Sequence, residues 1–185
     1  VDVLIPGPGS VNGVAGSTSG TSNPIVGTFD NINNLVGDSS GSNTLTGPNS
    51  ANAWIIDEAD SGTLNGLPFS GMPNLSGGSA TDSFTFELLG VLTGSIDGGG
   101  DSGDTIVGDD DGNIFTVNVD GGGTLTDLLV VDKTIGFSNV ENLTGGIGTD
   151  TFSVTATGSL TGTIDGGDGS DTIVGADNGN IFSVD

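Results

Sequence analysis

The sequence predicts an all-β protein folded as a parallel β-solenoid with coils of about 22 residues, and three observations favour this fold. First, short apolar segments return at nearly constant spacing along the chain. Second, turns rich in Gly, Asp and Asn separate these segments, and Gly supplies 36 of the 185 residues. Third, Asp outnumbers Glu by 21 to 3, and Asp favours turns where Glu favours helices.

The coil length follows from an Asp that precedes alternating apolar residues. This Asp occurs at Asp82, Asp104, Asp127, Asp150 and Asp171, at intervals of 22, 23, 23 and 21 residues. Equal spacing is required when each coil rests on the previous one. The sequence therefore predicts a single stacked apolar ladder of Phe84, Ile106, Leu129, Phe152 and Ile173. The alternative is an antiparallel β-sandwich, in which the Gly-Gly and Asp-Gly pairs are hairpin turns.

An internal duplication divides the chain. Residues 69–99 align with 137–167, with 17 of 31 positions identical, and 104–118 align with 171–185, with 11 of 15 identical. Such long-period similarity is typical of repeat architectures. We expect degenerate N-terminal coils over 1–68, a first repeat copy over 69–136 and a truncated second copy over 137–185, all in one continuous solenoid.

The charge balance excludes several classes of function. The chain has 24 acidic residues and a single basic one, Lys133, so its net charge is -23. Nucleic-acid binding needs several Lys or Arg residues to neutralise phosphates, and we expect none. No apolar run approaches the ~20 residues of a membrane span, so we expect no membrane insertion. Without Cys or His there is no thiol or imidazole chemistry.

Two charged segments have simple expected roles. Lys133 stands beside Asp132, and the expected role is a surface ion pair, with an isopeptide bond as the alternative. Residues 109–120 resemble an EF-hand loop in their acidic spacing, but Ile114 occupies the sixth position, which requires Gly. We therefore expect an exposed acidic turn at Asp109.

A nonapeptide motif points to calcium. Residues 145–153 and 166–174 both fit the pattern G-G-x-G-x-D-x-U-x, in which U is apolar, and degenerate copies begin at Gly77 and Gly99. The motif resembles the calcium-binding repeats of RTX proteins, which form parallel β-rolls. Calcium takes about six to eight oxygen ligands, which Gly-rich turns supply as carbonyls and Asp as carboxylates.

The expected calcium ligands lie in loops one coil apart, because stacked carboxylates repel one another unless a cation screens them. The first choices are the pairs Asp150/Asp171 and Asp82/Asp104. Asp101 and Asp168 come next, and Asp97 and Asp165 are weaker. The glycines of the predicted site are Gly145, Gly146, Gly148, Gly166, Gly167 and Gly169. The alternative is that each Asp only closes a turn by accepting hydrogen bonds from backbone N–H groups.

A longer resemblance suggests a function. Residues 137–146, with the segments 52–55 and 61–64, are similar to repeats of very large secreted bacterial proteins, the β-strand-repeat or filamentous-haemagglutinin-like adhesins. The resemblance covers roughly residues 43–185. It implies an extracellular or cell-surface location, a structural or adhesive role as filament, matrix or adhesin stalk, and no catalytic residue. A surface or glycan ligand is left unidentified.

We accordingly expect a protein that is not an enzyme, that self-associates into a filament and that Ca²⁺ stabilises. Two other functions remain open. One is an RTX-type module for calcium-dependent secretion and folding of a larger protein. The other is a polysaccharide-active β-helix enzyme with paired Asp residues as acid and base. A single Lys disfavours the enzyme, because an acidic polymer needs basic residues to bind it.

Overall fold

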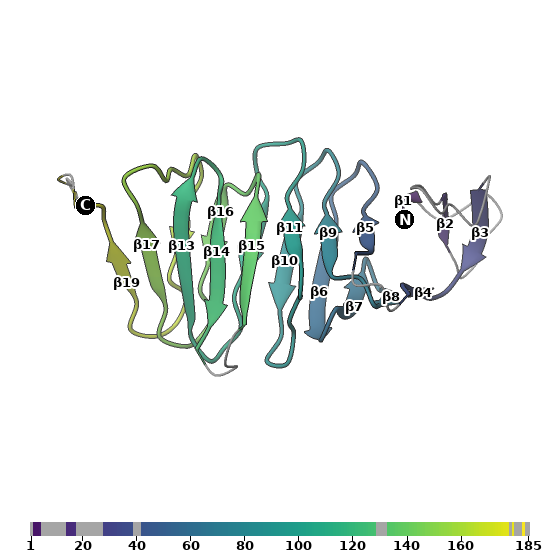
Figure 1. Ribbon diagram of the computed structural model, residues 1–185, viewed down its shortest axis with the longest axis horizontal. Helices are drawn as coiled ribbons and strands as arrows, with labels where there is room; N and C mark the ends of the chain where they lie inside the picture. Colours follow the sequence, from purple (N-terminus) through teal and green to yellow (C-terminus); the bar gives the residue numbers. More distant parts are fainter. Residues whose placement is uncertain are drawn as a thin grey trace.

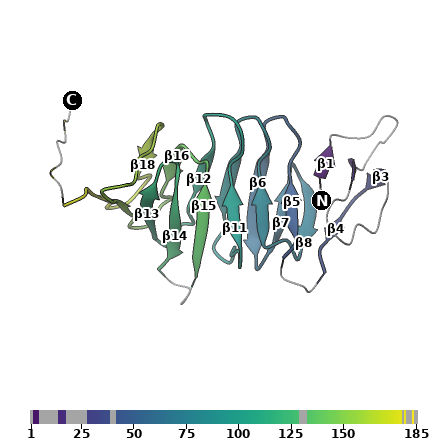
Figure 2. The ribbon, with the colours of Figure 1, turned by 45° about the horizontal axis from the view of Figure 1, so that its top comes forward.

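The computed structural model describes residues 2–4, 14–17, 28–38, 42–128, 133–177, 179 and 183. Within these ranges the chain forms strands and turns and no helix, which confirms the all-β prediction. The molecule is elongated, its strands cross the long axis, and the last described strand, β19 (Thr172–Val174), lies at the extremity opposite the N-terminal strand β3 (Thr28–Ile32) (Figures 1 and 2). Over the same ranges, the structure contains no helix that is long and apolar enough to cross a membrane.

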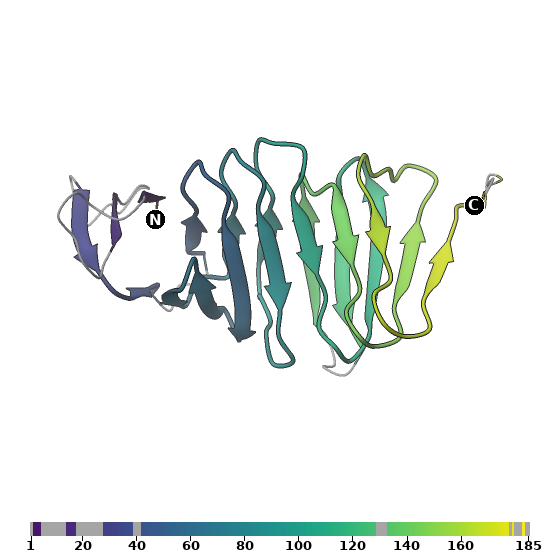
Figure 3. The ribbon, with the colours of Figure 1, turned by 180° about the vertical axis from the view of Figure 1, so that it is seen from behind.

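Two sheets make up the described part of the chain, one of eleven strands and one of eight. The longer sheet has the spatial order β19 (Thr172–Val174), β17 (Thr151–Val154), β13 (Asn113–Val119), β14 (Gly122–Asp127), β15 (Thr134–Ser138), β11 (Ser95–Asp97), β9 (Asn74–Ser76), β5 (Thr44–Thr46), β1 (Asp2–Leu4), β2 (Val14–Ser17) and β3 (Thr28–Ile32). The shorter sheet has the order β18 (Ile164–Asp165), β16 (Asn142–Thr144), β12 (Thr105–Val107), β10 (Ser83–Phe86), β6 (Ala53–Glu58), β7 (Ser61–Leu64), β8 (Leu67–Ser70) and β4 (Leu35–Val36). Figure 3 shows them from behind.

Strands that alternate between the sheets form the regular part of the fold. From β8 to β13 the chain crosses from one sheet to the other at every connection. We use coil for the stretch of chain that leads from one strand to the next parallel strand of the same sheet. Strands one coil apart pair in parallel, so that Phe84 on β10 lies beside Ile106 on β12, 22 residues on. In the other sheet Leu75 lies beside Ile96, 21 residues on. The predicted spacing holds at these places.

Antiparallel meanders interrupt the regular coils at β1–β3, β6–β8 and β13–β15. In the last of these, β13 lies three places beyond β11 in the longer sheet. The chain then folds back through β14, and β15 takes the place beside β11. The next strand of this sheet, β17, then pairs with β13. As a result Ile106 lies beside Leu143, 37 residues on, and the coil length is not uniform.

The predicted single apolar ladder is wrong. Phe84 and Ile106 lie in the shorter sheet, Phe152 and Ile173 lie in the longer one, and Leu129 is outside the described residues. The unit β6–β12 has the same topology as β13–β19, with the two sheets exchanged. Five crossings between the sheets separate β6 from β13, and an odd number of crossings places equivalent strands in opposite sheets.

One apolar core lies between the sheets. Its aromatic side chains stack across neighbouring parallel strands: the ring centroids of Trp54 and Phe84 are 5.5 Å apart, and those of Phe115 and Phe152 are 5.0 Å apart. All four side chains are fully buried. The two stacks occupy equivalent places in the two units, since β6 corresponds to β13 and β10 to β17. The core therefore repeats with the strand topology.

Candidate functional site

Several passages between the sheets end in an acid or an amide two residues before a large apolar side chain. These residues form two series, which we call ladders. The first ladder precedes strands of the shorter sheet and consists of Asn52, Asp82, Asp104 and Glu141. The second ladder precedes strands of the longer sheet and consists of Asn113, Asp150 and Asp171.

In the first ladder each carboxylate binds the backbone of the neighbouring coil. Oδ1 of Asp82 accepts hydrogen bonds from the backbone N–H of Asn52 at 2.8 Å and from its Nδ2 at 2.6 Å. Oδ1 of Asp104 accepts the N–H of Asp82 at 2.7 Å. Oε2 of Glu141 accepts the N–H of Asp104 at 3.0 Å. The ladder thus satisfies backbone donors that would otherwise be buried without partners.

The second ladder repeats this arrangement on the opposite passage. Oδ1 of Asp150 accepts the backbone N–H of Asn113 at 2.7 Å and its Nδ2 at 3.1 Å. Oδ1 of Asp171 accepts the N–H of Asp150 at 3.0 Å. Each ladder therefore starts with an Asn and continues with carboxylates.

The other carboxylate oxygen of the buried rungs lacks a donor. Asp82, Asp104 and Asp150 are at most 1% exposed, and no donor in the described part of the chain reaches Oδ2 of any of them. A Cβ on Gly77 would collide with both Oδ2 of Asp82 and the carbonyl oxygen of Gly98. The three oxygens are therefore buried, and Oδ2 of Asp82 and the carbonyl oxygen of Gly98 both approach the space in front of Gly77.

The second ladder has the same arrangement, since a Cβ on Gly145 would collide with both Oδ2 of Asp150 and the carbonyl oxygen of Gly166. At the equivalent place on the first rungs, Nδ2 of Asn52 donates to the carbonyl of Gly77 at 2.9 Å, and Nδ2 of Asn113 donates to that of Gly145 at 3.0 Å. This position is built for a donor. An ionised carboxylate oxygen carries no hydrogen to donate to the carbonyl oxygen. A proton or a cation between the two oxygens makes their approach favourable.

Burial changes the acidity of these groups. It raises the pKa of Asp104 to about 6, and the carboxylates of Asp82 and Glu141 add to the rise. Burial also raises the pKa of Asp82 and of Asp150, against the opposing effect of hydrogen bonds from Asn52 and Asn113. The raised pKa values favour the neutral carboxyl, whose O–H supplies the donor that Oδ2 needs.

The predicted acidic residues separate into two groups. The pairs Asp82/Asp104 and Asp150/Asp171 lie on neighbouring coils, although Asp171 is exposed at the end of its sheet. The loop residues Asp101, Asp168 and Asp165 are exposed and Asp97 is half-buried. Oδ1 of Asp101 accepts the N–H of Ser102, the next residue and not the one two residues on that the turn-closing alternative expects. Oδ1 of Asp97 accepts a hydrogen bond from Nδ2 of Asn139 at 2.7 Å.

The predicted glycines all lie in loops beside the second ladder. Gly145 and Gly166 leave room for Oδ2 of Asp150 and Asp171, respectively. Gly146, Gly167 and Gly169 have φ values of 119°, 83° and 143°, which residues with a Cβ rarely adopt. Gly148 lies against the backbone of Gly112.

The donor set fits a hard cation in chemical type, because it combines unsatisfied carboxylate oxygens with glycine carbonyl oxygens. Within the described ranges, however, no three Asp, Glu, His or Cys side chains converge on one point. A calcium ion at Asp82 or Asp150 would have to take most of its ligands from carbonyls, such as those of Gly98 or Gly166, and from water. The residues present therefore allow calcium without defining a complete coordination sphere.

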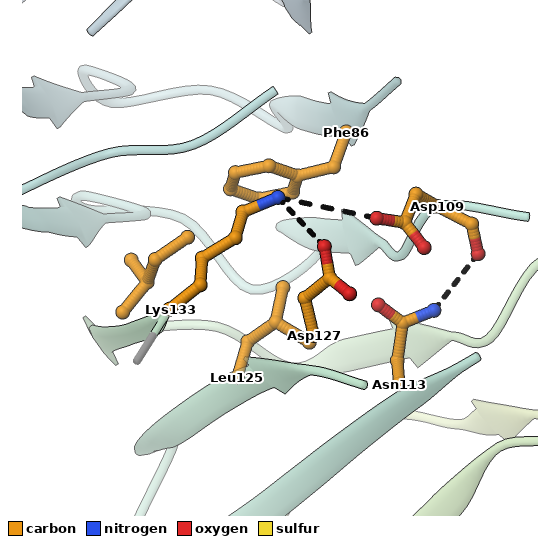
Figure 4. A pocket seen from close by; sticks show the side chains of 7 residues that line it. Phe86, Asp109, Asn113, Leu125, Asp127 and Lys133 are labelled. Carbon is orange, nitrogen blue, oxygen red and sulfur yellow. Dashed lines mark hydrogen bonds and ion pairs between the residues drawn. The ribbon is translucent and has the colours of Figure 1, made fainter. Parts of the chain in front are cut away.

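A second buried polar cluster corrects two predictions. Lys133 is only 5% exposed, and its Nζ lies 3.0 Å from Oδ2 of Asp127 and 4.0 Å from Oδ2 of Asp109 (Figure 4). The expected surface ion pair of Lys133 is therefore wrong, as is the exposed position expected for Asp109, which is 2% exposed. The register of β14 and β15 pairs Leu125 with Ile135, and the same alternation turns Asp127 and Lys133 inward.

Sequence reasoning missed Asn52, Asn113 and Glu141 as rungs. The signal was present: Asn52, Asp82, Asp104, Glu141 and the second ladder all stand two residues before a large apolar side chain. Lys133 carried a comparable signal, since it shares the alternate spacing of Ile135 and Phe137, which are buried.

No protein-family model, no curated protein and no solved structure matches the chain.

Proposed function

We propose that the protein is a structural, non-enzymatic segment of an extracellular bacterial surface protein, such as a filament, matrix or adhesin stalk. In this proposal the two sheets form a flattened β-solenoid into which meanders are inserted. The observation that carries the proposal is the repeated strand topology along one axis. An architecture whose units contact only their neighbours extends by the addition of further units.

The duplication and the topology support this reading together. The aligned segments 69–99 and 137–167 contain β9–β11 and β16–β18, strand for strand. The second unit, β13–β19, continues both sheets from the strands of the first unit, β6–β12, with the two sheets exchanged. In the same way, the strands at the end of the second unit could receive a third. The likeness of the repeats to those of giant secreted bacterial proteins is the reason for placing the protein outside the cell.

The C-terminal edge of the sheets supports self-association. Among the described strands, β18 and β19 each pair on one side only. Ile173 on β19 is 50% exposed, whereas its counterpart Ile106 in the first unit is 1% exposed. An unpaired edge with apolar side chains is a template for another strand. We therefore assign this edge as the surface that receives a further unit or a second copy of the chain.

Calcium belongs to the proposal as a stabilising cation at the buried rungs. Bound there, it would supply the positive charge that Oδ2 of Asp82, Asp104 and Asp150 lacks. The burial of these side chains also disfavours the polysaccharide-active enzyme, because a polymer cannot reach carboxylates that are at most 1% exposed. An RTX-type folding module shares the expected effect of calcium but requires no assembly.

The test combines negative-stain microscopy with sedimentation, each with calcium and with a chelator. We expect fibres or a ladder of oligomers, and we expect Ile173→Asp to reduce assembly without lowering the melting temperature. Ile147→Asp is the matched control, because Ile147 is 58% exposed but lies in a loop and not on an edge strand. A monodisperse monomer at high concentration in both conditions would overturn the assembly proposal. Calcium-dependent folding of a monomer would favour the secretion module instead.

A further inference from the structure

The only Lys of the chain lies in a buried row across the last meander. Register pairs Asn113 on β13 with Asp127 on β14, and the backbone N–H of Asp127 donates to the carbonyl of Lys133 at 3.3 Å. All three side chains are at most 6% exposed, and all three line one small pocket with Asp109 (Figure 4). The amine of Lys133 and the carboxyl of Asp127 are thus fixed opposite each other by the hairpin.

The surroundings of this pair are apolar. Phe86, Leu125 and Ile135 line the rest of the pocket, and Nζ of Lys133 lies over the ring of Phe86, 6.0 Å from its centroid. The pocket is too narrow to admit a water molecule. An amine and a carboxyl in contact at 3.0 Å are therefore held together where water does not compete for either group.

The charges in the pocket do not balance. Two carboxyl groups face one amine, so one carboxyl is stabilised in its protonated form. Burial raises the pKa of Asp109 to about 6, and the neighbouring Asp127 carboxylate adds to the rise. Oδ2 of Asp109 and Oδ2 of Asp127 lie 4.0 Å and 3.0 Å from the same Nζ, so the two carboxyl groups are neighbours between which a proton can pass.

We propose that Lys133 and Asp127 form an intramolecular isopeptide bond, with Asp109 transferring protons. The assignment of the carboxyl partner rests on distance, since Nζ lies 3.0 Å from Asp127 and 4.0 Å from Asp109. Asn113 holds Asp109 in place through a bond from Nδ2 to the Asp109 carbonyl at 2.8 Å. The isopeptide bond between Lys133 and Asp127 would link strands β14 and β15 covalently.

The reaction is a condensation that needs no oxidant or cofactor. The reaction starts from the arrangement in which the one proton of the two carboxyl groups lies on Asp127 and Asp109 is ionised. The Asp109 carboxylate accepts a proton from the Nζ ammonium, and the neutral amine attacks Cγ of the protonated Asp127 carboxyl to form a tetrahedral adduct. Asp109 then moves a proton from nitrogen to the departing hydroxyl. The C–O bond breaks, an N–C bond has formed, and one water molecule leaves. Asp109 starts as a carboxylate and ends as the neutral acid, because it keeps one of the protons that the Nζ ammonium group gave up.

The first test is the intact mass of the purified full chain. We expect a mass lower than that of the sequence by one water molecule. In denaturant, an amine-reactive reagent should label one position, the N-terminal amine, because the chain has no other primary amine than Lys133. Trypsin should leave the denatured chain uncut, since Lys133 is its only cleavage site.

Variants identify the groups. Lys133→Arg keeps the positive charge but lacks the nucleophile, and its mass should equal that of its sequence. This control also separates the isopeptide from succinimide formation at an Asp-Gly pair, which loses water without involving Lys133. Asp127→Ala should abolish the link. Asp109→Asn should abolish or strongly slow it while Lys133 and Asp127 remain, and circular dichroism of this variant should match that of the unmodified fold.

Three results would overturn the proposal. One is a wild-type mass equal to that of the sequence together with two labelled amines. Another is tryptic cleavage after Lys133 in the whole population. The third is a branched peptide that joins Lys133 to Asp109, which would show that Asp127 is not the electrophile. None of these results depends on filament formation or calcium, so the inference stands or fails separately from the proposed function.

Discussion

Asp150 distinguishes two interpretations of the ladders. In one, its carboxyl group only hydrogen-bonds to the neighbouring coil; in the other, it also binds calcium. Its Oδ1 binds Asn113, and its Oδ2 faces the Gly166 carbonyl without a donor. Asp150→Asn places an amide donor there, as Asn113 does one coil earlier. Without calcium we expect the variant to be more stable by about 1–3 kcal/mol, because a buried unsatisfied acceptor is removed. Urea unfolding in chelator measures the change.

The same variant tests the metal. If calcium binds at this rung, wild-type protein gains stability from millimolar calcium and Asp150→Asn gains much less. Asp57→Asn is the matched control, because Asp57 is exposed and belongs neither to the ladders nor to the predicted calcium ligands. Equal responses of all three proteins to calcium would exclude Asp150 as a ligand.

Asp104 predicts a pH dependence with a defined sign. Its pKa is raised to about 6 in the folded state, so between about pH 4 and pH 6 the folded state holds a proton that the unfolded state has lost. The contribution of Asp104 to the free energy of unfolding is fully present below about pH 4 and disappears as the pH rises through 6. We expect unfolding free energy in chelator to fall by at most about 3 kcal/mol over this range.

Asp104→Asn supplies the comparison for the pH dependence. The variant should show a shallower fall over the same range, because one titrating group has been removed, while Asp82 and Asp150 still contribute in the same direction. Denaturation curves at matched ionic strength measure the difference. A stability that rises with pH, or identical slopes for both proteins, would contradict the assignment.

At the scale of the elements, coil-to-coil contact depends on glycines that end strands. A Cβ on Gly98, which follows β11, would collide with the carbonyl oxygen of Asn139 on the next coil and lie 2.8 Å from Oδ2 of Asp104. Gly98→Ala must push neighbouring coils apart, and we expect a loss of about 1–3 kcal/mol or more. Thermal unfolding followed by circular dichroism measures it.

Gly100→Ala is the matched control, two residues further along the same loop. A Cβ at Gly100 meets its nearest neighbour at 3.7 Å, which is ordinary van der Waals contact. We expect its melting temperature to stay near that of the wild type. If Gly98→Ala and Gly100→Ala have the same melting temperature, the close approach of neighbouring coils at Gly98 does not contribute to the stability of the fold.

The elements also show which features could be predicted from local pattern. The alternation of Ser83–Phe86, with Phe84 and Phe86 inward, predicts a strand with one buried face. The same alternation in Gly122–Asp127 belongs to an antiparallel strand. Because the local pattern is the same for both kinds of pairing, the meander β13–β15 was not predictable from it. The uniform 22-residue coil failed for this reason.

For the whole molecule, the net charge of -23 predicts a strong dependence on salt. Like charges spread along the rod oppose the compact state, and dissolved ions screen them. We expect the melting temperature to rise as sodium chloride increases from about 0.01 M to about 0.5 M. Calcium should raise it further at equal ionic strength, as the buried rungs require. A rod indifferent to both salts would mean that the Asp residues serve only as turn formers.

The sequence alone determined the all-β class, the duplication and the pairing of Asp82 with Asp104 and of Asp150 with Asp171, because local alternation and spacing encode these features. Only the tertiary structure decided that equivalent strands exchange sheets and that Lys133 lies between Asp127 and Asp109. Each of these depends on how many times the chain crosses between the sheets and where it folds back. Those choices move residues by whole strands while leaving the inward and outward alternation of each strand unchanged.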